Sequence, residues 1–319
     1  MSRWGKLYKD HRDWSKYTEE LVVRGEFILD LSFVDNWYSE LNEMNYGKRG
    51  SPFIFPKSFM KWIAIWHQFT NYRALEGITR QLAKMKIIPY SADYSTICYR
   101  VQHMKPIIKM PDYYELEIGT DGTGLKTSNA GEYRIWKYGD PDAKKKKHLV
   151  VIITAEVRKK RIISIEAHIE GEGKSEPEMA EESIDEIVSQ GYKVNKFYGD
   201  GAFDTNRMFG KMHEVGGEAV IKIRSNASPD NIRGSKWRRK ESREYKKKGY
   251  KKWSEEKGYG MRWPGTEGIF SAVKRAFGEN TVSRSKKGIE AEGYQRFWVY
   301  NVMKLYGESK VKEENIMQT

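Results

Sequence analysis

Apolar residues recur at helical spacing through the first third of the chain, from about residue 28 to residue 105. Apolar side chains three or four residues apart share one face of a helix, so this spacing predicts amphipathic helices. Proline is favoured in the first helical turn, and Pro56 immediately precedes one of these segments. Thr70 or Asn71 can cap the next one. We expect helices over residues 28–41, 57–69, 70–85 and 93–104, after a polar and aromatic arm over residues 1–20.

The helices expected over residues 70–85 and 93–104 are joined by the turn IIPYSA. Two short helices joined by a turn form the helix-turn-helix motif that reads DNA, and the second begins here with DYST. An ordinary helical hairpin would give the same pattern. This stretch alone favours neither interpretation.

The pattern changes near residue 114, where short apolar runs alternate with polar turns and helical segments. Five runs predict strands, over residues 114–124, 148–157, 161–170, 193–204 and 218–223. The second and third of these are joined by RKK and predict a hairpin. Helices are expected over residues 175–191, 205–217, 266–278 and 291–307. This order predicts a mixed sheet with helices on its faces, an α+β or α/β fold.

A basic stretch over about residues 224–258 separates the last expected strand from the helix at 266–278. From Asp230 to Gly258 there are twelve Lys or Arg and five Asp or Glu, so this stretch supplies +7 (12 − 5) of the net charge of +13. Basic residues interleaved with aromatic ones suit phosphate contacts and stacking on unpaired bases. A solvated loop would have the same composition. Together with a pI of about 9.4, the charge favours a nucleic-acid partner.

Several classes of protein are excluded by what the sequence lacks. With Cys98 as its one cysteine, the chain can form no intrachain disulfide and no multi-cysteine zinc site. No stretch reaches the roughly 20 apolar residues that span a bilayer, and the N-terminus has no signal-peptide core. The six histidines show neither HxH nor HExxH spacing, and the sequence has no P-loop or dinucleotide fingerprint. We expect a cytoplasmic, nucleoid-associated protein with no membrane partner.

Two aspartates lie in matching contexts, Asp121 in IGTDGTG and Asp200 in FYGDGAFD. Each follows an apolar strand and precedes glycine, which projects a carboxylate from the edge of a sheet, where active sites gather. An Asp-Gly turn without a function would look the same. Glu267 opens a predicted helix, where an acid also stabilises the helix dipole. Together the three carboxylates suit Mg²⁺, and two such ions can activate a nucleophile and stabilise the leaving oxygen at a phosphodiester.

Several segments, in their order and spacing, resemble the DDE transposases of bacterial and archaeal insertion sequences, whose catalytic domain has the ribonuclease-H-like fold. The matching segments are YRALEGITRQLAKM with DYSTICYRV, TDGTGLK, KKHLVVIITAE, YGDGAFDTNR, TEGIFSAVKRAFG and WVYNVMKLY. Asp121 precedes Asp200 by 79 residues (200 − 121), and Asp200 precedes Glu267 by 67 (267 − 200). The resemblance implies that these three are the catalytic and metal-binding acids, with two Mg²⁺ or Mn²⁺ ions as cofactor.

A Tyr–Arg–Glu–Lys signature surrounds the third acid in this family, and Tyr259, Arg262, Glu267 and Lys274 resemble it. Four residues separate Arg262 from Glu267, where the pattern has three, and Trp263-Pro264-Gly265 can absorb the extra one. The resemblance implies that Lys274 contacts DNA near the cleavage site. The full set of expected DNA contacts is Lys274, Arg262, Tyr259, Lys126, Trp237, Arg238, Arg239, Lys246 and Lys247.

The resemblance also implies an activity, its partners and a domain organisation. The protein would cleave DNA at the terminal inverted repeats of a mobile element and transfer the freed strand into double-stranded target DNA, as a homodimer in the synaptic complex. We expect a helical DNA-binding region over residues 1–108, a catalytic domain over residues 109–308 and a flexible tail over residues 309–319. The alternatives are a relative that binds DNA without cutting it, and a metal-dependent nuclease of the same fold, which would leave cut ends unjoined.

Overall fold

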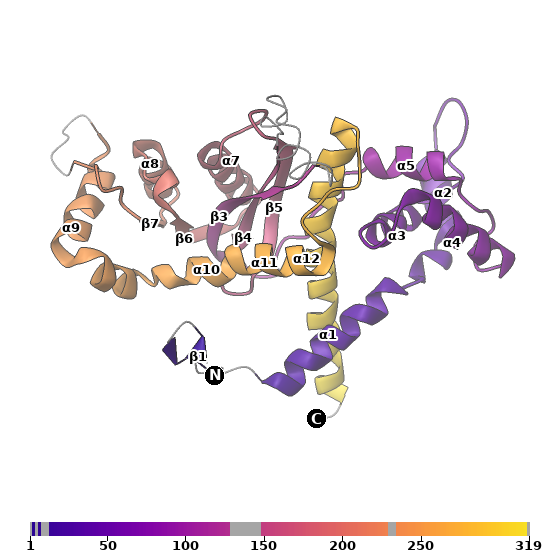
Figure 1. The fold of residues 1–319 in the computed structure, drawn as a ribbon, viewed down its shortest axis with the longest axis horizontal. Helices are drawn as coiled ribbons and strands as arrows, with labels where there is room; N and C mark the ends of the chain where they lie inside the picture. The colour runs from indigo at the N-terminus through magenta and orange to yellow at the C-terminus, as the bar shows by residue number, and fades with distance from the viewer. Residues whose placement is uncertain (1, 4–5, 8–12, 128–147, 229–233, 318–319) are drawn as a thin grey trace, which may run out of the picture. The chain divides into compact units, whose positions relative to one another are not determined.

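The computed structural model describes residues 2–3, 6–7, 13–127, 148–228 and 234–317 (Figure 1). The chain divides into two compact units. One is formed by Met1–Ile97 with Val299–Thr319, and the other by Cys98–Trp298. All three predicted acids belong to the second unit.

The second unit is built on a five-stranded mixed sheet with the strand order β5-β4-β3-β6-β7. β3, β4 and β5 form an antiparallel meander, and β6 and β7 continue the sheet parallel to β3. The bounds are β3 Glu115–Leu125, β4 Leu149–Glu156, β5 Arg161–Ile169, β6 Lys193–Gly199 and β7 Glu218–Ile221. The predicted mixed sheet, and the hairpin between β4 and β5, are confirmed.

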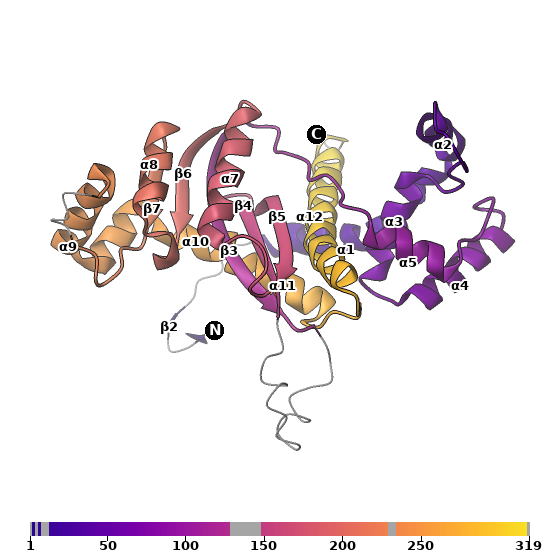
Figure 2. The same ribbon diagram turned by 90° about the horizontal axis from the view of Figure 1, so that it is seen from above.

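One face of the sheet is covered by α7 (Glu176–Ser189) and α8 (Asn206–Glu214), as Figure 2 shows. Ile118 of β3 and Ile184 of α7 belong to one buried apolar core that also includes side chains of β6 and α8. A polar contact lies within the same layer, since Thr154 of β4 donates a hydrogen bond to Ser183 of α7. This face of the sheet is therefore committed to packing.

The opposite face of β3 is approached by α10 (Arg262–Gly265) and α11 (Glu267–Phe277). The approach depends on glycine, because a Cβ added to Gly265 would lie 2.6 Å from the side chain of Val157. Successive residues of a strand point to opposite faces, so Asp121 points towards α10 and α11 whereas its neighbours point towards α7. Both faces of β3 therefore contribute to the surroundings of Asp121.

The basic stretch before α10 is helical from Lys236 onwards, so a loop does not describe this part of it. α9 runs from Lys236 to Lys257, with a break at Gly249, where φ is 74°. A short 3₁₀ turn, η4 (Tyr259–Met261), connects it to α10. The last helix, α12 (Lys286–Met317), continues through most of the tail that was expected to fray, in a stretch after Gly307 without glycine or proline.

The first unit is mostly helical, as predicted, and its buried aromatic side chains include Trp37, Phe59 and Trp62. Its elements are β1 Ser2–Arg3, β2 Lys6–Leu7, α1 Trp14–Ile28, η1 Ser32–Val34, α2 Trp37–Asn45, α3 Lys57–His67 and α4 Tyr72–Lys84, and α5 (Tyr94–Gln102) begins in it. The predicted capping residue Asn71 accepts a hydrogen bond from the backbone N–H of Ala74.

Two expectations for the first unit were wrong. The arm predicted over residues 1–20 is helical from Trp14 onwards, because Asp13 caps α1 by accepting a hydrogen bond from the backbone N–H of Lys16. The single helix predicted over residues 28–41 is broken, because the carboxylate of Asp30 accepts a hydrogen bond from the backbone N–H of Ser32 and turns the chain before α2. In both cases a local side-chain contact overrides the apolar periodicity.

The turn between α4 and α5 is held by specific contacts. The hydroxyl of Thr79 accepts a hydrogen bond from the backbone N–H of Ala92, and Glu76 accepts one from that of Tyr94. These contacts fix a pair of helices as the sequence predicted. They suit a helix-turn-helix reader and an ordinary hairpin equally, so DNA reading by this pair stays a prediction.

Candidate active site

Asp121 and Asp200 lie at the same level on neighbouring parallel strands. The last register pair between β3 and β6 joins Gly119 to Tyr198, and each aspartate follows two residues later. The interval of 79 residues between the two acids therefore equals the register offset of the strands (198 − 119). Because parallel strands run in the same direction, this register places both carboxylates beyond the end of β6.

Asp121 does not end its strand, as the sequence suggested, but lies inside it. β3 continues to Leu125 and remains paired with β4, where Asp121 faces Ile153. β6 stops at Gly199. Past Gly119, β3 therefore has a neighbouring strand on its β4 side and an open edge on its β6 side.

The carboxylate of Asp121 is largely buried and has three hydrogen-bond partners. Its Oδ2 accepts from Arg262 Nη1 at 2.8 Å and from the hydroxyl of Thr266 at 3.3 Å, and its Oδ1 accepts from the backbone N–H of Gly122 at 3.0 Å. Burial raises the pKa of Asp121 above its ordinary value despite the opposing charge of Arg262, and the negative charge of Asp200 raises it further. Crowding of negative charge is thus built into the site.

Asp200 is held by the turn that follows β6. It caps the short 3₁₀ helix η3 (Gly201–Phe203), and its Oδ1 accepts a hydrogen bond from the backbone N–H of Ala202 at 2.7 Å. A Cβ added at Gly199 would lie 2.9 Å from the side chains of Phe197 and Phe203. The glycine before Asp200 therefore lets the chain turn tightly over the aromatic core.

Glu267 approaches Asp121 from the first turn of α11. Its Oε1 accepts a hydrogen bond from Arg262 Nη2 at 3.2 Å, and its side chain remains 42% exposed. Burial raises the pKa of Glu267 above its ordinary value, Arg262 opposes that rise, and Asp121 adds to it. The helix N-terminus and the guanidinium both favour the ionised form.

The guanidinium of Arg262 thus bridges Asp121 and Glu267, the position at which a shared cation would balance the same two charges. In this arrangement no three His, Cys, Asp or Glu side chains of the described residues stand close enough to hold a metal ion. Oxygen ligands from several carboxylates are nevertheless the donor set that Mg²⁺ and Mn²⁺ prefer. The chemistry of these acids therefore suits a divalent cation, whereas their observed spacing, with Arg262 between two of them, does not form a closed metal site.

Glu176, the first residue of α7, is an acid of the site that the sequence interpretation missed. A Cβ added to Gly122 would lie 2.3 Å from its Oε1, so its carboxylate rests against the α-carbon next to Asp121. Burial raises the pKa of Glu176, and the charges of Asp121 and Asp200 raise it further. The signal in the sequence was weak, because an acid in the first turn of a helix is expected on dipole grounds alone.

The expected DNA contacts divide into buried and exposed groups. Tyr259 is 2% exposed and packs against Trp253, and burial raises the pKa of Tyr259 to about 12. Arg262 is 7% exposed and committed to the two acids. In the observed arrangement neither side chain is available to DNA.

The residues expected at the start of α9 are also largely committed to the protein. Trp237 packs against His213 with 3.6 Å between ring centroids, and Arg238 forms a bidentate ion pair with the buried Asp204 at 2.6 and 2.9 Å. Arg239 is half-buried. The remaining expected contacts are exposed or half-exposed. They are Lys126 after β3, Lys246 and Lys247 on α9, and Lys274 on α11.

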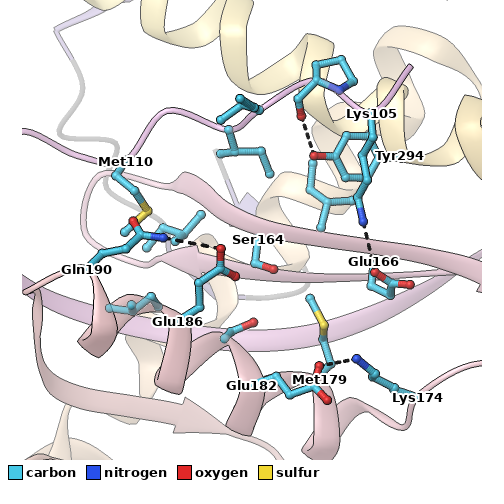
Figure 3. Close-up of a pocket in the computed structure, with 17 residues that line it drawn as sticks. Lys105, Met110, Ser164, Glu166, Lys174, Met179, Glu182, Glu186, Gln190 and Tyr294 are labelled. Atoms are coloured by element: carbon cyan, nitrogen blue, oxygen red, sulfur yellow. Dashed lines mark hydrogen bonds and ion pairs between the residues drawn. The ribbon is translucent and has the colours of Figure 1, made fainter. Parts of the chain in front are cut away.

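Two hollows in the second unit differ in their relation to the acids. One, of about 740 Å³, is lined by Asp200 and Arg262 together with Tyr245, Tyr250 and Trp263. The other, of about 460 Å³, lies beside β5 and α7 and shares no lining residue with the acid site (Figure 3). In Figure 3 four of its charged groups form two ion pairs, Lys105 with Glu166 and Lys174 with Glu182. Only the first of these two hollows adjoins the candidate chemistry.

Comparison with known protein families identifies the family of the chain. Two family profiles, each described as a transposase DDE domain, match residues 22–130 and residues 118–302. The chain belongs to the DDE transposase family. The second match includes Asp121, Asp200 and Glu267, and it confirms the expectation of a transposase, an enzyme that acts on DNA. Transposases of this family generally use divalent metal ions.

Solved structures with some likeness to this transposase are also transposases. A piggyBac transposase synaptic complex with hairpin DNA aligns at a TM-score of 0.35 and 8% identity, over 89% of this chain and 74% of that one. A pre-cleavage Mos1 transpososome aligns at a TM-score of 0.25 and 10% identity, over 96% of this chain and 98% of that one. Neither likeness is strong enough to extend what the family match shows. No curated protein matched the transposase, and no helix in the described part of the chain is long and apolar enough to cross a membrane.

Proposed function

We propose that Asp121, Asp200 and Glu267 are the catalytic acids of this transposase and that together they hold two Mg²⁺ or Mn²⁺ ions. The observation that carries the proposal is the β3–β6 register, which brings the two aspartates to one level beside the first turn of α11. Bound divalent ions would supply charge neutralisation at the phosphodiester and activation of a hydroxyl nucleophile. The activity would be cleavage at the ends of a mobile element and transfer of the freed strand into target DNA.

The surrounding residues position these acids. Thr266 and Arg262 hold Asp121, the η3 backbone holds Asp200, and the α11 N-terminus favours an ionised Glu267. A DNA phosphate could offer Arg262 an alternative anionic partner, which would release the carboxylates. We assign Arg262 this positioning role at the acids, in addition to the contact with DNA that the resemblance implies.

The DNA interface that we propose uses the exposed cations close to the acids and along α9. Lys274 lies two turns after Glu267 on α11, and Lys246 and Lys247 lie on α9. Lys126 directly follows β3 and forms an isolated β-bridge with Asn280. Trp237, Arg238 and Arg239 would support this interface mainly by fixing α9, because two of them are paired inside the protein and the third is half-buried.

The larger assembly follows from the proposed reaction. Two element ends must be cut together, so we propose a homodimer that binds both terminal inverted repeats and then target DNA. The helical region over residues 1–108 would recognise the repeats, and the region over residues 109–308 would carry the chemistry. A place at the nucleoid in the cytoplasm belongs to the same proposal.

A cleavage and joining assay tests this function. DNA carrying the inverted repeats that flank the gene is incubated with the full chain, Mg²⁺ or Mn²⁺ and a plasmid target. We expect cut ends and inserted products from the wild type, and neither from Asp200→Ala. Asp185→Asn is the matched control, since Asp185 is an exposed acid of α7 that pairs with Lys211. Equal products from wild type and Asp200→Ala would refute the proposal, and cutting without joining would indicate a nuclease.

A further inference from the structure

Glu176 is a carboxylate at the site that the three acids of the family do not include. It occupies the first turn of α7, on the face of the sheet opposite to α10 and α11. Asp121 and Gly122 are consecutive and point to opposite faces of β3. Glu176 therefore reaches the neighbourhood of Asp121 from the other side.

The end of β6 and the absence of a side chain at Gly122 make this approach possible. β3 has no paired β6 residue beyond Gly119, so its edge is open beside Asp121. A Cβ added at position 122 would meet Glu176 Oε1 at 2.3 Å, Cδ at 3.2 Å and Cγ at 3.5 Å. Real Cβ atoms do not approach other heavy atoms that closely, so any larger residue would displace the carboxylate.

Arg262, which contacts two of these acids, supplies a second, independent indication that a ligand is missing at the site. Its side chain is 92% buried (100 − 8), and its Nε–H has no hydrogen-bond partner among the described residues. A buried donor without a partner is costly unless a ligand or another arrangement satisfies it. The observed pairing of Arg262 is therefore incomplete, as expected of a site that is rearranged when its ions and DNA phosphate bind.

We propose that Glu176 is a fourth carboxylate of the metal site and contributes directly to holding the divalent ions. This inference rests on the proposed function of Asp121, Asp200 and Glu267. An additional anionic oxygen strengthens the binding of a hard cation and helps to fix its position between the sheet and α7. Gly122 is then part of the same metal site, because it leaves room for the Glu176 carboxylate.

Metal binding without DNA tests the assignment, using the full chain and Mn²⁺, with free Mn²⁺ measured by electron paramagnetic resonance. We expect Glu176→Gln to weaken Mn²⁺ affinity by about tenfold or more. Glu178→Gln is the matched control, because Glu178 lies in the same helical turn, is exposed, and accepts a hydrogen bond from Ser175 that glutamine can also accept. It should change the affinity by less than about threefold.

A double-mutant cycle separates a ligand from a structural residue. Gly122→Ala should weaken Mn²⁺ binding in the wild-type background by displacing the carboxylate, and should have little further effect when Glu176 is already alanine. Thermal unfolding without metal checks that each variant folds. Glu176→Gln behaving like Glu178→Gln would overturn the inference. If the wild type bound no Mn²⁺, or Asp200→Asn bound it as well as the wild type, the three-acid site itself would fail, which is a separate result.

Discussion

Arg262 donates a 2.8 Å hydrogen bond through Nη1 to Oδ2 of Asp121, so a guanidinium neutralises the acid at the centre of the site. Its Nη2 reaches Glu267 at the same time. The four residues between Arg262 and Glu267, one more than the family pattern has, include the turn of α10 that lets the arginine fold back onto its own neighbour. In the absence of DNA, the protein therefore supplies its own counter-ion.

Replacing this arginine should make metal binding easier without DNA. In Arg262→Gln a divalent ion no longer has to displace a guanidinium, so we expect Mn²⁺ affinity to rise by roughly tenfold, or about 1.4 kcal/mol. Strand transfer should nevertheless fall, because a phosphate contact is lost. Arg275→Gln is the control, since Arg275 lies on the neighbouring helix α11 and hydrogen-bonds to Ser271 instead of to the acids. Unchanged affinity in Arg262→Gln would show that the guanidinium does not compete with the ion.

The stability that Asp121 contributes to the metal-free protein should fall as pH rises through the acidic range. The pKa of Asp121 is raised on folding, so between its ordinary value near 3.8 and its higher folded value the folded state binds more protons than the unfolded state. The stabilisation that protonated Asp121 contributes is complete below this pH window and is lost above it. Asp121→Asn should remove this contribution, measured as the difference in unfolding temperature between wild type and variant against pH without metal.

Addition of Mg²⁺ should reverse that trend. The ion binds the ionised carboxylates, so the metal-induced rise in unfolding temperature should grow as pH increases through the same window. A metal response that is independent of pH, or that persists in Asp121→Asn, would contradict the role of Asp121 as a ligand.

Arg238 should matter more for stability than for DNA affinity. It pairs bidentately with Asp204, whose side chain is fully buried, so Arg238→Met would leave an uncompensated buried charge and cost about 3–5 kcal/mol of unfolding free energy. Lys240→Met, an exposed position on α9, is the control and should cost less than about 0.5 kcal/mol. Denaturant unfolding measures both. A stable Arg238→Met protein with weakened DNA binding would instead indicate that Arg238 contacts DNA.

Lys246 and Lys247 should contribute to DNA affinity through phosphate contacts. Replacing both with alanine should weaken binding at all sequences and reduce the slope of log affinity against log salt by about 2, or about 1 per lysine. Titrations of labelled DNA at several salt concentrations measure this slope. Lys193→Ala, which removes an exposed lysine that pairs with Glu115, should leave the slope unchanged. If the α9 double variant had the same slope as the wild type, these two lysines would not contact DNA phosphates.

Much of the fold was predictable because its signals are local. The strands and α7, α8 and α11 follow apolar runs and helix ends, which the sequence shows directly. The two aspartates could be recognised as a pair because each follows an apolar run and precedes a glycine. What the sequence could not show is that their spacing is the register offset of β3 and β6, which depends on how the strands dock.

The remaining site residues depend on contacts between distant segments. Glu176 reaches the site because β6 ends early and because Gly122 has no side chain. Neither of these features produces a recognisable pattern in the sequence. Arg238 looked like a DNA contact because it lies in a basic run, whereas its partner Asp204 is 34 residues away in sequence. Charge composition identifies a kind of partner, but tertiary packing decides which cations remain free to meet it.

The parallel pairing of β3 with β6, and the position of Glu267 behind both, also set the order in which the transposase can become active during its synthesis. β3 leaves the ribosome long before β6, and Glu267 leaves after every strand of the sheet. A nascent chain that has made both aspartates still lacks the third acid and the arginine that neutralises Asp121. With the three acids acting as proposed, a chain that ends before Glu267 should not cut DNA, so an unfinished product of that kind should be harmless to the chromosome around it.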